Sequence, residues 1–217
     1  MKKLMNIDEA AAHIKDGMTV MLGGFLGVGA PSTVIDKMIE NGVKDLTVIA
    51  NDTSFPDQNI GKLVVNKQVK KVIASHIGTN PETGRQMNEN EMEVILVPQG
   101  TLAEQVRAGG AGLGGVLTPT GLGTVVEDGK QKVTINGKVY LVEEALKADV
   151  AVIKALKADK KGNLVYDKAA RNFNPLMAMA ADLVIAEVDE IVEVGEISPD
   201  MVMTPNIFVN IVVKGEK

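Results

Sequence analysis

The sequence predicts an α/β fold, an open and mainly parallel sheet with helices on both faces. Short β-branched apolar runs recur at residues 46–50, 69–74 and 92–97, and such runs are typical of strands that are buried on both faces. Segments with helical apolar periodicity accompany them. No linker or low-complexity stretch divides the 217 residues, so we expect one domain, residues 1–217.

The first elements are a capped helix, a strand and a glycine-rich loop. Asn6 and Glu9 form a capping pair in front of a helical apolar stripe, which Gly17 ends. The apolar run at residues 18–22 predicts a buried strand. Four glycines within seven residues follow it, and then Pro31, which fits the first turn of a helix.

The glycine-rich loop, residues 23–30, is the first candidate binding site. Glycines let backbone N–H groups approach a ligand and take conformations that a Cβ forbids. Between a strand and a helix, such a loop forms a cradle for an anion or a carbonyl group. The order Gly24-x-x-Gly27-x-Gly29 disfavours the common dinucleotide and nucleoside-triphosphate sites. The alternative is a tight turn packed closely against a neighbour.

The rest of the chain adds helices, a hairpin and further strands. The strongest hairpin signal is Asn136-Gly137, which joins residues 133–135 to 138–142 as a β-hairpin excursion near 133–142. Residues 109–123 read as loop. Thr101 and Glu104 predict a capping box for a helix that ends near residue 108. We also expect a helix that is marked by apolar residues at 34, 35, 38 and 39 and stopped by Gly42, another at 175–181, and strands at 150–155, 183–186 and 208–213.

Composition excludes several classes of function. A net charge of −5 and only six aromatic residues argue against nucleic-acid binding. The absence of cysteine rules out disulfides and a thiol nucleophile, and two histidines leave no metal site to expect. No signal peptide and no apolar run of membrane-spanning length is found, so we expect a cytoplasmic protein with no membrane partner.

Five stretches resemble, in the same order, the α (A) subunit of class I CoA-transferases of the acetate/butyrate–acetoacetate type. They are DGMTVMLGGFLGVGAP at residues 16–31, LTVIANDT at 46–53, ASHIGTNP at 74–81, VPQGTL at 97–102 and RNFNP at 171–175. The resemblance covers almost the whole chain. It implies the open α/β fold that CoA-transferases share with sugar-phosphate isomerases.

The resemblance also implies a reaction and a partner. Such enzymes move CoA from a short-chain acyl-CoA to a carboxylate through a glutamyl-CoA thioester, and the glutamate lies in a Ser-Glu-Asn-Gly motif of the β subunit. This chain lacks that motif; the nearest string, at residues 39–42, has no serine, and Glu40 reads as a solvated helix end. We therefore expect an α subunit in a heterotetramer or larger αβ assembly, with CoA as substrate and no permanently bound cofactor.

Site residues follow from the same resemblance. Gln99 and Asn51 each follow a predicted strand, so their amides should emerge at the carboxyl edge of the sheet. The resemblance implies that Gln99 borders the reacting carboxylates and that Asn51 contacts the pantetheine; capping of strand-end turns is the alternative. Phe25 packs against pantetheine or in the core. The expected CoA-binding residues are Gly23, Gly24, Phe25, Leu26, Gly27, Val28, Gly29, Ala30 and Asn51.

A second function stays open on the same fold. The chain is alternatively a non-catalytic acyl-CoA or phosphosugar sensor, or a sugar-phosphate isomerase. A sugar-responsive repressor needs a helix-turn-helix and a basic surface, and an isomerase is a complete catalyst alone. The acyl-chain preference depends on a few pocket residues and is not fixed by the sequence.

Overall fold

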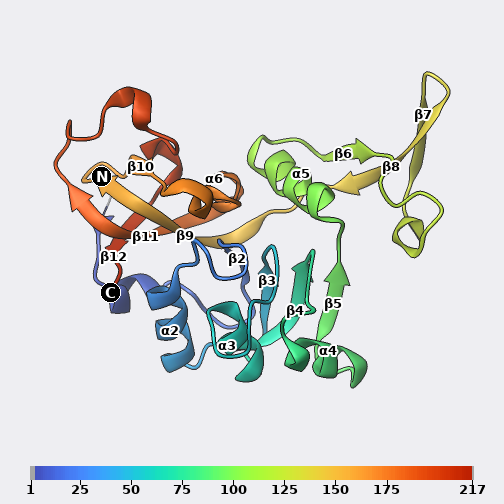
Figure 1. The fold of residues 1–217 in the computed structure, drawn as a ribbon, viewed down its shortest axis with the longest axis horizontal. Helices are drawn as coiled ribbons and strands as arrows, with labels where there is room; N and C mark the ends of the chain where they lie inside the picture. Colours follow the sequence, from blue (N-terminus) through green and yellow to red (C-terminus); the bar gives the residue numbers. More distant parts are fainter. Residues whose placement is uncertain (1–2, 217) are drawn as a thin grey trace.

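Nine strands form one sheet within residues 3–216, the part of the chain that the computed structural model describes (Figure 1). Neighbouring strands are parallel except for β10 (Leu164–Val165), which runs antiparallel to β9. In order across the sheet, the others are β1 (Lys3–Leu4), β12 (Ile211–Lys214), β11 (Ala181–Val192), β9 (Ala148–Asp159), β2 (Thr19–Leu22), β3 (Leu46–Ile49), β4 (Val69–Ala74) and β5 (Glu93–Leu96).

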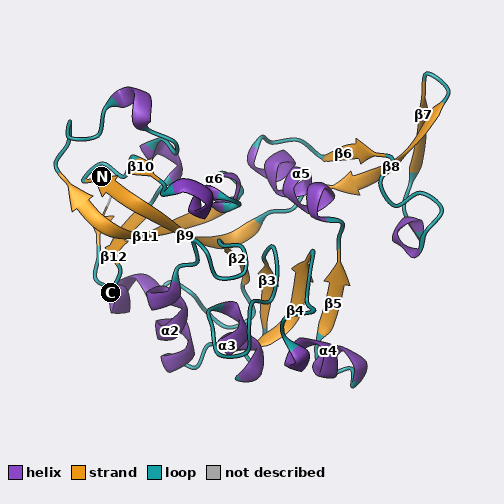
Figure 2. Ribbon diagram, in the orientation of Figure 1, coloured by secondary structure: helices purple, strands orange, loops and turns teal. Residues whose placement is uncertain are grey.

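Helices cover both faces of this sheet, which confirms the predicted fold class (Figure 2). None of the helices in residues 3–216 is both long and apolar enough to cross a membrane. The helices are α1 (Ile7–Ala11), α2 (Ser32–Glu40), α3 (Ile60–Val65), α4 (Pro81–Asn88), α5 (Gln99–Gly110) and α6 (Asn174–Met177).

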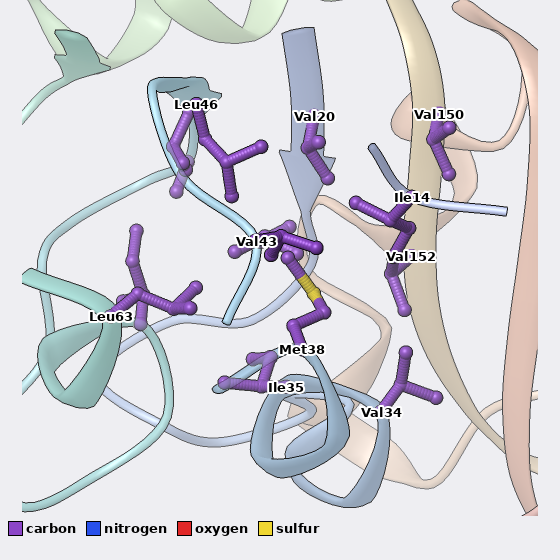
Figure 3. Packing of buried hydrophobic residues seen from close by; sticks show 14 of the residues in the cluster. Ile14, Val20, Val34, Ile35, Met38, Val43, Leu46, Leu63, Val150 and Val152 are labelled. Carbon is purple, nitrogen blue, oxygen red and sulfur yellow. The ribbon is translucent and has the colours of Figure 1, made fainter. Parts of the chain in front are cut away.

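The core has two halves because successive residues of a strand point to opposite faces. Val20 and Leu22 of β2 pack with Met38 of α2 in one cluster (Figure 3). Met21, between them in sequence, packs in the other cluster with Leu102 of α5. All five side chains are almost fully buried, and each contributes about 1.5–3 kcal/mol by leaving water.

The chain changes direction across the sheet between β2 and β9. From β2 it passes through β3 and β4 to the edge strand β5, and it later returns to β9 on the other side of β2 before continuing to β11 and β12. The carboxyl ends of β2 and β9 therefore form a topological switch point, where open α/β sheets bind their ligands. The glycine-rich loop leaves β2 at this point.

The predicted hairpin is confirmed. It belongs to a separate antiparallel sheet that projects from the domain, in the order β6 (Gly115–Thr118), β8 (Lys138–Glu144), β7 (Lys132–Ile135) (Figure 2). Asn136 and Gly137 have φ of +50° and +76°, as a two-residue hairpin turn requires. Strand β6 lies in the stretch expected to be loop, because its pairing with β8 is a distant contact that a glycine-rich composition does not reveal.

The amino-terminal cap is as predicted, but helix α5 is not. Asn6 and Glu9 exchange both hydrogen bonds of a capping box, but α1 ends at Ala11, six residues before the predicted end at Gly17. Helix α5 begins at Gln99, so Thr101 and Glu104 lie inside it instead of forming its cap. It also extends past residue 108 to Gly110, and a Cβ on Gly109 would lie 1.9 Å from the backbone oxygen of Leu146.

Other boundaries also differ from those predicted. Helices α3 and α4 span six and eight residues, too short for a clear periodic signal, and were not predicted; neither was β1. Helix α6 ends at Met177, and β11 begins at Ala181, which the sequence places in a helix. Phe208 lies in a 3-10 turn before β12. In the described chain β5 is an edge strand, and its side chains are partly exposed instead of buried.

Gly61 provides a test of how closely α3 packs on the segment before it. A Cβ on Gly61 would lie 1.8 Å from the backbone oxygen of Phe55. We expect Gly61→Ala to lower the free energy of unfolding by about 1–3 kcal/mol, the usual effect of overpacking. Gly84 of α4 faces open space, so Gly84→Ala should raise it by about 0.5–1 kcal/mol. Urea unfolding measures both changes. Equal free energies of unfolding for Gly61→Ala and Gly84→Ala would contradict the close packing of Gly61.

Candidate functional site

The glycine-rich loop has a tight turn at its tip. Phe25 and Val28 exchange two backbone hydrogen bonds, of 3.0 and 2.9 Å, and Leu26 and Gly27 form the turn between them. Both turn residues have positive φ, +45° and +85°, the sign that a type I′ turn requires. Gly27 adopts this conformation freely, whereas Leu26 carries a Cβ and is strained by about 1–3 kcal/mol.

Close packing explains two glycines at the ends of the loop. A Cβ on Gly23 would lie 1.8 Å from Oδ1 of Asn174, and one on Gly29 would lie 2.4 Å from the backbone oxygen of Ala170. The alternative of a turn packed against a neighbour thus describes these two positions. A Cβ on Gly27 would come closer than ordinary contact only to the side-chain end of Asn59, at 2.9 Å, with Gln58 and Ser54 in ordinary contact at 3.5 and 3.9 Å.

Two asparagines outside the loop hold its backbone in place. The fully buried Asn174 donates from Nδ2 to the oxygen of Gly29, at 3.0 Å, and accepts at Oδ1 from the N–H of Lys154, at 3.0 Å. Asn172 donates to the oxygen of Val28, at 2.9 Å. Both belong to the RNFNP stretch, for which the sequence suggested no role. Two asparagines separated by one residue, the second followed by a proline, are the only local signal.

Three N–H groups of the loop make no hydrogen bond to another described residue: those of Gly24, Gly27 and Gly29. Gly24 is buried, whereas Gly27 and Gly29 are partly exposed. Gly27 and Gly29 thus combine an N–H group without such a bond with some exposed surface. Such donors stabilise negative charge that develops on a carbonyl oxygen.

The tip of the loop presents apolar side chains to solvent. Phe25, Leu26 and Val28 are 41%, 37% and 54% exposed, so the core position considered for Phe25 is excluded. Ala30 is partly exposed, and its N–H donates to the oxygen of Gly27, at 3.2 Å, where the chain leads into α2. The loop thus combines backbone donors with an apolar rim.

The two amides expected at the carboxyl edge of the sheet meet there. Gln99 donates from Nε2 to Oδ1 of Asn51, at 2.8 Å. Gln99 is exposed, whereas Asn51 is only 2% exposed. Asn51 also accepts from Oγ of Ser75, at 3.2 Å, and donates from Nδ2 to Asp52, at 2.7 Å. Asn51 therefore lies behind Gln99, which has the free surface.

Glu40, in the nearest match to a nucleophile motif, lies elsewhere. It is the last residue of α2, is largely exposed, and forms an ion pair with Lys37 at 2.9 Å. Its environment is that of a surface residue. The glycine-rich loop and the Asn51–Gln99 pair thus form the candidate site without a carboxylate nucleophile from this segment.

Comparison with known proteins decides the family. The model described as "Coenzyme A transferase" matches residues 4–215. The chain belongs to the coenzyme A transferase family. It is 57% identical to the acetate CoA-transferase subunit alpha of Escherichia coli, over 99% of this chain and 98% of the relative. It is 51% identical to the acetoacetyl-CoA:acetate/butyrate CoA transferase alpha subunit of Clostridium acetobutylicum, over 98% of this chain and 97% of the relative.

Solved structures of CoA-transferases share the fold. An acyl-CoA transferase of Escherichia coli, in a thioester complex with CoA, aligns with a TM-score of 0.90 and 24% identity over 99% of this chain and 47% of that chain. This chain thus spans about half of that solved chain. Glutaconate coenzyme A-transferase from Acidaminococcus fermentans aligns with a TM-score of 0.87 and 19% identity, over 98% of this chain and 75% of its own. The predicted resemblance is confirmed, and CoA transfer is favoured over the sensor or isomerase alternative.

Asn174 tests how firmly the loop of this CoA-transferase chain is held. In Asn174→Asp, an acceptor faces the backbone oxygens of Gly29 and Ala170 in place of the donor they need. We expect the free energy of unfolding to fall by about 3 kcal/mol, because a buried acceptor is left without a donor. The exposed Asn41→Asp is the control, with a change of about 1 kcal/mol or less. Equal losses in the free energy of unfolding for Asn174→Asp and Asn41→Asp, measured with urea, would show that Asn174 does not stabilise the loop.

Proposed function

We propose that the chain is the α subunit of a heteromeric, cytoplasmic CoA-transferase that moves CoA from a short-chain acyl-CoA to a carboxylate such as acetate, butyrate or acetoacetate. The observation that carries the proposal is the glycine-rich loop, at the switch point of the sheet with the Gly27 and Gly29 N–H groups left for a ligand. The names of the relatives support the subunit role and the substrate class. CoA takes part as a substrate, and the proposal includes no resident cofactor or metal.

The transfer requires a carboxylate nucleophile, which we assign to the partner β subunit. Its glutamate attacks the acyl-CoA carbonyl and expels CoA thiolate, which leaves a mixed anhydride. The thiolate then attacks the glutamyl carbonyl, releases the acyl group as a carboxylate and leaves a glutamyl-CoA thioester. The acceptor carboxylate reverses these steps and departs as the new acyl-CoA.

The contribution of this chain is to stabilise charge and position the substrates. Each attack develops negative charge on a carbonyl oxygen, and the N–H groups of Gly27 and Gly29 are the donors assigned to it. Removing one such donor lowers rates by about 10²–10³ in enzymes where this has been measured. Gln99 borders the reacting carboxylates; an amide donates and accepts hydrogen bonds without acting as a competing nucleophile.

The remaining loop residues are assigned to CoA itself. The exposed side chains of Phe25, Leu26 and Val28 offer an apolar surface for pantetheine. Gly23, Gly24 and Ala30 give the loop its shape. The resemblance assigns Asn51 to pantetheine, but its side chain is buried behind Gln99, so we assign it to support of the Gln99 amide.

The half-enzyme proposal predicts that catalysis needs both subunits. The purified chain should show no CoA transfer from acetyl-CoA to butyrate, and activity should appear on adding the β subunit of the same organism. The reason is that a loop of backbone donors forms no covalent intermediate by itself. Formation of butyryl-CoA, separated by chromatography, measures the reaction in a heterotetramer or larger αβ assembly.

The position of the thioester provides the decisive control. Borohydride reduction after incubation with acyl-CoA marks the modified carboxylate, and mass spectrometry should find the mark on the β subunit. A modified carboxylate within residues 1–217, at Glu40 or elsewhere, would contradict the division of labour between the subunits.

The contact between Gln99 and Asn51 predicts coupled kinetic effects in the αβ complex. Gln99→Ala should lower kcat more than it raises KM, if the amide favours the charged transition state. Asn51→Ala should then have a smaller effect in the Gln99→Ala background than alone, with a coupling energy of about 1 kcal/mol. Steady-state kinetics of the two single variants and the double variant give this energy. Fully additive losses would mean that the two amides work independently.

A further inference from the structure

Asp52 is a buried carboxylate that accepts three hydrogen bonds. It is 4% exposed and lies directly after Asn51, beyond the end of β3. Its Oδ2 accepts from the N–H of Leu26, at 2.8 Å, and from Nδ2 of Asn51, at 2.7 Å. Its Oδ1 accepts from the N–H of Ser54, at 2.8 Å. One side chain therefore contacts both the glycine-rich loop and the amide pair.

The contact with Leu26 lies at the strained point of the loop. Leu26 is the non-glycine residue of the turn at the tip, and its φ of +45° is one that side chains disfavour. Such a conformation persists only where surrounding contacts hold the backbone in it, and residues of this kind cluster at functional sites. The carboxylate of Asp52 adds to the two Phe25–Val28 bonds that close the turn, because it binds the N–H of Leu26 from the segment that follows β3.

The contact with Asn51 sets the direction of a chain of amides. An ionised carboxylate only accepts hydrogen bonds, so Asn51 must turn Nδ2 towards Asp52. Its Oδ1 then faces Gln99, which must donate a hydrogen bond to it from Nε2. Gln99 keeps its oxygen and one amide hydrogen for the solvent side. A group able to donate at position 52 would permit the opposite orientation of both amides.

We propose that Asp52 is a positioning residue of the CoA-transfer site, which holds the loop turn and orients the Gln99 amide at the same time. The inference rests on the proposed function. The buried carboxylate of Asp52 acts through Leu26 and Asn51. Loss of its carboxylate should therefore disturb the donors of the loop and the amide together.

Asp159 offers a matched control in the same chain. It is 3% exposed and also accepts three hydrogen bonds, from the N–H groups of Lys161 and Asn163 and from Nδ2 of Asn163. These partners lie two and four residues away, in the turn that follows β9. Asp159 thus has the burial and bonding of Asp52 without any contact to the loop.

The test uses the αβ complex carrying Asp52→Ala, Asp52→Asn or Asp159→Asn, with acetyl-CoA and butyrate as substrates. We expect Asp52→Ala to lower kcat by about 10²-fold with little change in KM, since displaced catalytic groups cost about this much. Asp52→Asn should keep more activity, because asparagine retains an acceptor for Leu26. Asp159→Asn should keep the kcat of the unaltered complex. Hydrogen exchange of the peptide spanning residues 23–30 should be faster in Asp52→Ala, less so in Asp52→Asn, and unchanged in Asp159→Asn.

Each outcome supports or overturns the positioning role of Asp52. Unchanged kcat in Asp52→Ala, or equal losses in Asp52→Asn and Asp159→Asn, would overturn the positioning role. If the unaltered complex transfers no CoA, the proposed function fails by itself. The exchange measurement still tests Asp52 in that case. If residues 23–30 are protected equally in Asp52→Ala and Asp159→Asn, Asp52 does not stabilise the loop.

Discussion

The parallel pairing of β2 with β9 is the contact on which the rest of the structure depends. Val20 pairs with Val150, and Leu22 with Val152, in the middle of the sheet. The pairing continues one residue further, because the N–H of Gly23 donates to the oxygen of Val152 at 3.0 Å. The strands on either side lead away in opposite directions, so this pair places the glycine-rich loop at the switch point. A slip of one residue would exchange the two faces of β2, so that Val20 and Leu22 would face the half of the core that now holds Met21.

The glycine-rich loop is held from two sides before any ligand arrives. Asn174 fixes its end next to α2, and Asp52 fixes its tip from the β3 side. Backbone donors held in this way need no reorganisation when charge develops, which is the basis of electrostatic catalysis. The strain at Leu26 and the tight packing at Gly29 are thus two aspects of one rigid, preformed arrangement.

Local patterns in the sequence were enough to predict the sheet and the glycine-rich loop, but not the side chains that hold the loop in place. The β-branched runs and the glycines carry their own conformational preferences, so strands such as 69–74 were predicted correctly. Asp52 and Asn174 act on loop residues 26 and 145 positions away, and no spacing rule connects such pairs. Thr101 and Glu104 failed as a cap because α5 begins two residues earlier, at Gln99, with Pro98 in the N-cap position. The contacts assigned to CoA stay predictions, since they depend on a ligand and a second subunit.

The order of strands also governs how the chain folds as it leaves the ribosome. Strand β3 follows β2 closely, but the other neighbour of β2 comes much later: the N–H of Thr19 bonds to Asp149, 130 residues away. Until β9 is synthesised, β2 has one edge without a partner, and unpaired edges promote association between nascent chains. Contacts of such long sequence separation also slow folding. The strand at the centre of the finished sheet is therefore among the last to be enclosed, and the loop takes its final form only then.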